Sequence, residues 1–132
     1  MSRPNLLSTD KQRLLFAKKI KSHVGKGTRI TSEVIAEEWY GVTVNDSKDS
    51  SFVRGIVHWL RRYAEIEDKH DSSRVRVLCA DDDGYFLAES SLEAFSYGVR
   101  FHRRNRSQIL AEEAVWEGAE DMLAWEEEHE ST

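Results

Sequence analysis

The sequence predicts a mostly helical α+β domain in which three short helices and a β-hairpin precede a long C-terminal helix. Apolar residues recur at helical spacing in four segments, and two strand-like runs flank the turn Asp81-Asp82-Asp83-Gly84. The chain holds a single proline, Pro4, so no proline interrupts the helices predicted after it. With 132 residues, the chain has room for one domain that buries a core without metal or disulfide.

The N-terminal part predicts a loose arm over residues 1–8, followed by a basic helix. Thr9 or Asp10 can cap this helix, which we expect to run to about Val24. Its predicted buried stripe consists of Leu14, Ala17, Ile20 and Val24, and Leu15 and Phe16 widen it. Two glycines at positions 25 and 27 then favour a turn.

The middle of the chain predicts a minimal strand at Arg29-Ile30 and two further helices. Thr31 caps the second helix over residues 32–40, and Gly41 ends it. A polar, cap-rich segment, residues 45–51, opens the third helix, which runs to about Tyr63. This third helix has the clearest amphipathic pattern of the chain.

A β-hairpin is expected after a polar loop over residues 67–73. Its strands are residues 74–80 and 85–88, and Gly84 can take the positive φ that a tight reversal needs. A calcium loop is excluded, because counting from Gly84 places Cys79 and Ser90 where carboxylates are required. Cys79, the single cysteine, lies in an apolar run and is interpreted as a small core residue.

The C-terminal part predicts a long acidic helix over residues 91–130. Ser90 and Glu93 form a capping box at its start, and Leu92, Phe95 and Val99 line one side. A break near either internal glycine, at 98 or 118, stays open. Residues 112–130 hold nine acidic side chains and no Lys or Arg. The apolar residues of this segment need burial on the domain or against a second copy, and we favour a homodimer whose contact residues are Trp116, Met122 and Trp125.

Two motifs carry a resemblance to a known family. Val53-Arg-Gly-Ile-Val-His-Trp-Leu-Arg61 precedes the hairpin, and Gly84-Tyr-Phe-Leu-Ala88 closes it. With the order helix, short strand, helix, helix, hairpin, long arginine-bearing helix, they resemble small phage-type winged helix-turn-helix DNA-binding proteins. The likeness covers roughly residues 31–110.

The resemblance implies a winged-helix domain over residues 9–90 that binds double-stranded DNA. Residues 49–63 would be the recognition helix and residues 74–88 the wing. Cations on these elements and around the glycine turn would contact bases or phosphates. The candidate nucleic-acid-binding residues are Lys26, Arg29, Lys48, Arg54, His58, Arg61, Arg62, Arg74 and Arg76.

Charge leaves two functions open. Residues 1–30 carry a balance of +7, whereas residues 31–90 and 91–132 each carry −6. A basic head and an acidic tail can serve different surfaces or neutralise each other. The first function is DNA binding by a phage-type regulator or replication factor. The second is a protein-interaction module or DNA mimic, favoured by the acidic turn tip and the acidic start of the third helix.

Other classes find no support in the sequence. The five histidines are scattered without metal spacing, and no nucleophile elbow, phosphate loop or dinucleotide-binding glycine pattern occurs. We therefore expect no enzyme, no cofactor and no metal. No apolar run approaches the ~20 residues of a membrane span, and a single cysteine suits a reducing compartment. A cytoplasmic location without membrane contact is the expectation.

Overall fold

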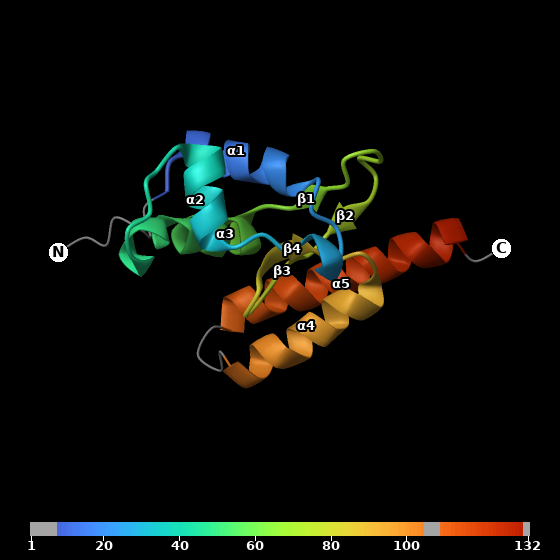
Figure 1. Cartoon of the computed structure of the whole chain (residues 1–132). Helices are drawn as coiled ribbons and strands as arrows, with labels where there is room; N and C mark the ends of the chain where they lie inside the picture. Colours follow the sequence, from blue (N-terminus) through green and yellow to red (C-terminus); the bar gives the residue numbers. More distant parts are fainter. Residues whose placement is uncertain (1–7, 105–108, 131–132) are drawn as a thin grey trace.

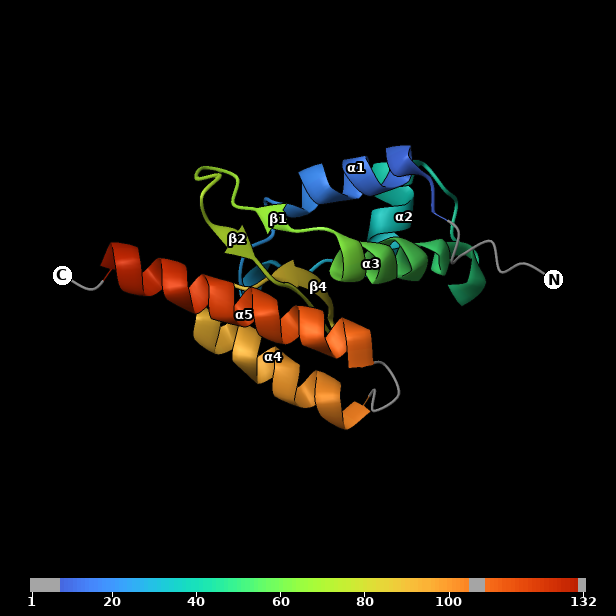
Figure 2. The same ribbon diagram turned by 180° about the vertical axis from the view of Figure 1, so that it is seen from behind.

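A computed structural model describes residues 8–104 and 109–130 and has a mostly helical α+β fold. Helices α1, α2 and α3 lie on one side, α4 and α5 lie on the other, and the strands stand between them (Figure 1). Figure 2 shows the same arrangement from behind. The elements are α1 (Asp10–Ile20), α2 (Ser32–Tyr40), α3 (Phe52–Tyr63), β1 (Ile66–Glu67), β2 (Val75–Arg76), β3 (Leu78–Asp81), β4 (Gly84–Leu87), α4 (Ser91–Arg104) and α5 (Ile109–Glu130).

Local capping signals place the starts of α1 and α2 as predicted. The Thr9 hydroxyl accepts the Gln12 amide at 3.2 Å, and the Gln12 side chain accepts the Thr9 amide at 2.9 Å. The Thr31 hydroxyl accepts the Val34 amide and so caps α2, and Gly41 ends this helix with a φ of 67°. These ends depend on residues a few positions apart, so the sequence alone predicts them.

Helix α1 differs from its prediction in length and in buried side. It ends at Ile20 rather than near Val24, because Val24 forms a bridge with Leu87 and the next amide donates to the Leu87 carbonyl at 2.8 Å. Leu14, predicted to be buried, is 72% exposed. Phe16, at the edge of the predicted stripe, is fully buried, and its ring packs edge-on against Trp39 with centroids 5.3 Å apart.

The hairpin around the three aspartates is confirmed, but its first strand is shorter than predicted. Strand β3 pairs with β4 from Leu78–Leu87 to Asp81–Gly84, whereas β2 pairs with β1. Residues 74–80 therefore divide at Val77, whose side chain packs near α5 at Gly118. Glu67, expected in a loop, forms a strand with Val75.

One residue of the predicted minimal strand Arg29-Ile30 pairs with the hairpin. Ile30 bridges Tyr85 with N–H···O distances of 3.0 and 2.8 Å, so the order across this layer is Ile30, β4, β3. Gly84 has a φ of 135°, and an added Cβ would lie 2.5 Å from the Ile30 carbonyl oxygen. A glycine is required here for both backbone conformation and space.

The prediction of one long C-terminal helix is wrong. The segment forms α4 and α5, which pack side by side as a helical pair (Figures 1 and 2). Neither glycine marks the division, because α4 ends at Arg104 and α5 begins at Ile109. An added Cβ on Gly98 would lie 2.9 Å from the Trp116 ring, and one on Gly118 would lie 2.7 Å from Val77. Both glycines therefore allow neighbouring elements to pack closely. The pattern of residues along one helix does not reveal such contacts with other elements.

The apolar side predicted for the start of α4 is only partly confirmed, because Phe95 packs against a core whereas Leu92 and Val99 do not. Leu92 is 75% exposed and Val99 is 45% exposed, whereas Ala94 and Tyr97 are buried. The capping box there is only half as predicted. The Ser90 hydroxyl accepts the Glu93 amide, but the Glu93 carboxylate accepts the amide of Glu89 instead of Ser90.

The hairpin separates two apolar cores. Alternate residues of a strand face opposite sides, so Leu78 and Leu87 join the core against α1, α2 and α3. Cys79 and Phe86 join the core against α4 and α5. The prediction that Cys79 is a core residue is confirmed, and burial raises the pKa of its thiol to about 12. None of the helices in the described ranges has both the length and the apolar character for crossing a bilayer.

Candidate nucleic-acid interface

Three of the predicted contact residues form one basic row along α3. Arg54 is exposed, and His58 and Arg62 are half-buried; they follow at intervals of four residues and so share one side of the helix. No acidic residue occurs between Ser50 and Ala64 to neutralise the row. We call Arg54, His58 and Arg62 the α3 row.

Within the α3 row, His58 is held in its neutral form. Arg62 Nη1 donates to His58 Nε2 at 3.2 Å, which requires an unprotonated ring nitrogen there. Partial burial lowers the pKa of His58 from its usual value, and the nearby charges of Arg62 and Arg61 lower it further. The row therefore presents two guanidinium groups and a neutral imidazole at neutral pH.

Arg61 belongs to α3 but points away from the row. Its Nη2 donates to the Leu78 carbonyl on β3 at 3.3 Å, and its guanidinium lies 5.4 Å from the centroid of the Tyr97 ring. Arg61 thus ties α3 to β3 and α4. Its predicted place beside Arg54 and Arg62 is wrong, because the two cores put different neighbours on adjacent faces of the helix.

The acidic residues that precede α3 accept hydrogen bonds from nearby backbone amides. Asp46 accepts the Lys48 amide at 2.8 Å, and Asp49 accepts the Asn45 amide at 2.8 Å. Hydrogen bonds from the amides of Asn45 and Asp46 lower the pKa of Asp49. The Lys48 side chain is exposed in the 3₁₀ turn Ser47–Ser50, which precedes α3.

Arg29 and Lys26 lie near the hairpin turn. Arg29 Nε donates to Asp81 Oδ2 at 2.7 Å, so the charge of this arginine is matched within the chain. Lys26 is exposed, as are Asp82 and Asp83 at the turn tip. The tip is therefore a poor contact for phosphate, and Lys26 is the one of these two predicted cations without a carboxylate partner among the described residues.

Arg74 and Arg76, predicted as wing contacts, make contacts inside the chain. Arg76 Nε donates to Asp68 Oδ1 at 2.7 Å, Nη1 donates to the Ala88 carbonyl at 2.8 Å, and the side chain is 9% exposed. Arg74 lies over the Trp125 ring, 4.4 Å from its centroid, and 3.7 Å from Glu126. The structure thus uses both as ties between segments, which corrects their assignment to a DNA contact.

The three residues predicted to bind a partner also pack within the chain. Met122 is 1% exposed, and Trp116 lies against Phe95 with ring centroids 6.1 Å apart. Trp125 donates its indole N–H to the Ser73 hydroxyl at 3.1 Å and is half-buried. Burial on the domain removes the reason for a dimer through these residues.

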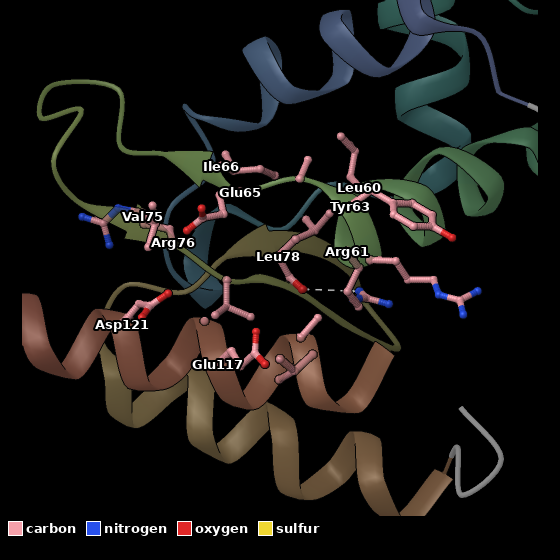
Figure 3. A pocket seen from close by; sticks show the side chains of 16 residues that line it. Leu60, Arg61, Tyr63, Glu65, Ile66, Val75, Arg76, Leu78, Glu117 and Asp121 are labelled. Atoms are coloured by element: carbon pink, nitrogen blue, oxygen red, sulfur yellow. Dashed lines mark hydrogen bonds between the residues drawn. The ribbon is translucent and has the colours of Figure 1, made fainter. Parts of the chain in front are cut away.

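A cavity of about 310 Å³ opens between the end of α3, β1–β2 and α5 (Figure 3). Apolar side chains such as Leu60, Ile66 and Leu78 line its inner wall. Arg61 comes from the α3 side, whereas Glu117 and Asp121 come from α5. The mixed charges favour no single class of ligand, and within the described ranges no cluster of His, Cys, Asp and Glu could hold a metal.

The basic head and the acidic tail lie apart. Helix α1 and helix α5 are on opposite sides of the molecule, with α3 and the strands between them (Figures 1 and 2). The described residues include no ion pair between these two helices. Within the described ranges, α1 and α5 therefore do not neutralise each other through ion pairs. The side chains of Arg103, Arg104 and Arg106 lie outside the described residues.

One contact of the basic head was missed by sequence reasoning. The Arg13 guanidinium lies 4.1 Å from the centroid of the Trp59 ring and links α1 to α3 beside the α3 row. Arg13 lies four residues after the cap residue Thr9, and nothing in that local pattern indicates a distant aromatic partner.

Comparison of the chain with protein-family models, curated proteins and solved structures gives no match.

Proposed function

We propose that this chain is a winged-helix protein that binds double-stranded DNA through α3. The order of elements supports the fold: α1, the Ile30 bridge, α2, α3 and then the β3–β4 hairpin. Ile30 pairs with β4 and β4 pairs with β3, which makes a small three-stranded layer beside the helices. A recognition helix in such a fold lies on this unit with its outer side open to the major groove.

The α3 row is the observation that carries the proposal. Arg54, His58 and Arg62 are accessible along two turns of a helix that has no acidic residue of its own. Arginine is the residue best suited to guanine edges and to phosphates, because its planar fork donates two parallel hydrogen bonds. Lys48, exposed in the turn before α3, adds one more positive charge to this part of the chain.

The hairpin takes a lesser part in this binding mode. Asp82 and Asp83 are exposed at the turn tip and would repel the DNA backbone. Arg29, Arg74 and Arg76 are engaged by Asp81, Glu126 and Asp68. We therefore infer contact through α3 with the hairpin tip turned away from the phosphates.

The test is fluorescence anisotropy on a mixed-sequence duplex at low salt. Changing Arg54 and Arg62 together to alanine should weaken binding by at least about tenfold, since each direct contact is worth about 1–3 kcal/mol. Lys19→Ala with Lys69→Ala removes the same charge from exposed positions that are not candidate DNA contacts. This control should change binding by less than about threefold if the contact is specific to α3.

A protein partner is the second candidate, favoured by the exposed acidic side of α5. The exposed acidic residues there are Glu113, Glu117, Glu120, Asp121, Glu127 and Glu128. An acidic helix of this kind can occupy a surface that otherwise binds nucleic acid. Absence of any anisotropy change with the unmodified chain at low salt would reject DNA binding and favour this function.

A further inference from the structure

Two helices on opposite sides of the molecule expose a leucine between charges of opposite sign. On α1, Leu14 is 72% exposed and stands between Lys11 and Lys18, both exposed. On α5, Leu123 is 40% exposed and stands between Glu120 and Glu127, both exposed. In each case the charges lie three residues before and four residues after the leucine, one turn away on the same side.

These two faces differ from ordinary solvated helix surfaces. Leu14 and Leu123 are the exposed large apolar residues of their helices among the side chains that the structure describes. Neither Lys11 nor Lys18 forms an ion pair with another described residue. The α1 face, defined as Lys11, Leu14 and Lys18, thus combines an apolar centre with unmatched positive charge.

The acidic face lies on the last third of α5, where the start of α4 packs alongside. The Ser91 amide donates to Glu126 at 2.9 Å, which places the two segments level with each other. We define the α5 face as Glu120, Leu123 and Glu127, which are all exposed.

We propose that the α1 face of one copy of this chain docks on the α5 face of the next copy. The two faces are complementary in charge and match in spacing, so the leucines meet at the centre while lysines and glutamates pair around them. Because α1 and α5 lie on opposite sides of the molecule (Figures 1 and 2), the contact joins different patches head to tail. Repetition of this contact builds a chain of molecules rather than a closed two-fold dimer.

The association is weak and depends on salt. One helix against one helix buries less surface than the ~1,200 Å² at the low end of stable interfaces. Exposed charges separated by more than about 10 Å are screened at 0.1 M salt, and even close pairs weaken as salt rises. The proposal does not depend on DNA binding, since the α3 row takes no part in it.

Sedimentation velocity of the full chain, without DNA, tests the contact by charge reversal. The unmodified chain should show an average mass that rises with concentration at low salt and falls towards the monomer at about 0.5 M salt. Lys11→Glu with Lys18→Glu should abolish this rise, and so should Glu120→Lys with Glu127→Lys. An equal mixture of the two variants should associate again, because each face then meets a partner of opposite charge.

Lys19→Glu with Lys26→Glu is the matched control, with the same change of net charge at exposed positions outside the α1 face. It should retain self-association within about threefold of the unmodified chain. A monomer at every concentration at low salt overturns the proposal, as does a control that loses association equally. Failure of the mixture to associate, with both variants folded by circular dichroism, overturns it too, and a species that stops at two copies rejects the head-to-tail arrangement.

Discussion

Arg54 and Arg62 of the α3 row differ from Arg74 and Arg76, at β2, in what surrounds them. Arg54 is exposed and Arg62 is half-buried, and both lie on a helix without acidic residues. At β2, Arg76 is paired with Asp68 and Arg74 with Trp125 and Glu126. Both segments are basic in sequence and both belong to elements that a winged helix would use for DNA. Availability for an outside partner is therefore decided by which acid or aromatic ring the fold brings to each guanidinium.

Removing Arg76 should give the largest effect of this comparison. Arg76→Ala removes the donor to Asp68 Oδ1 and to the Ala88 carbonyl in a site where the arginine side chain is 9% exposed. We expect a loss of about 2–4 kcal/mol in the free energy of unfolding, measured by urea denaturation. Arg54→Ala, at an exposed position, should change it by less than about 0.5 kcal/mol. Equal losses for the two variants would contradict the distinction.

Arg62 and Arg74 should separate DNA affinity from stability. Arg62→Ala is expected to weaken duplex binding about tenfold and to reduce the salt dependence of the affinity, because one contact is lost. Arg74→Ala should leave the affinity within about twofold while lowering stability, since it removes the contact over Trp125. Anisotropy titrations at three salt concentrations measure both. A loss of affinity with Arg74→Ala that matches Arg62→Ala would show that β2 belongs to the interface.

His58 should give the smallest effect, a dependence of DNA affinity on pH. Its pKa in the free protein is lowered by burial and by Arg62 and Arg61, so the ring is neutral at pH 7. A bound phosphate favours the charged ring, hence binding takes up a proton and tightens as pH falls through the pKa of the complex. Affinity at about pH 5.5 should exceed that at about pH 7.5 by a few-fold. His58→Gln should remove this increase.

Folding sets a limit on that experiment. A histidine with a lowered pKa in the folded state stabilises the fold above the unfolded pKa near 6.5, and this contribution is lost as pH falls through the folded pKa. The protein must therefore be shown to remain folded at the lower pH by circular dichroism. If His58→Gln retains the same pH dependence, a different group controls it.

The sequence predicted most of the first half of the chain and much less of the second. Thr9, Thr31 and Gly41 act on neighbours within four residues, so their caps were readable in advance. The helical pair α4–α5 was not readable, since a single acidic segment fits one helix or two. Gly98 and Gly118 were interpreted as positions where the helix could break. In the structure they are the positions where Trp116 and Val77 pack too closely for a larger residue.

The candidate site shows the same division. The sequence predicted that Arg54, His58, Arg61 and Arg62 share part of the surface of this amphipathic helix, and three of them do lie on one side. Arg61 follows the same pattern, yet the second core draws it to Leu78 and Tyr97. A period of 3.6 residues tells which residues share a side but not which element will cover the next side.

By itself, the amino-acid sequence determined the helix caps, the reversal at Asp82-Asp83 and the burial of Cys79, because each depends on local hydrogen bonding or on a short apolar run. The tertiary structure alone decided which cations remain accessible. Arg29 meets Asp81 across 52 residues of chain, and Trp125 meets Ser73 across the same separation. Such pairings are set by how the two cores pack against the shared hairpin, and that packing is a property of the whole chain.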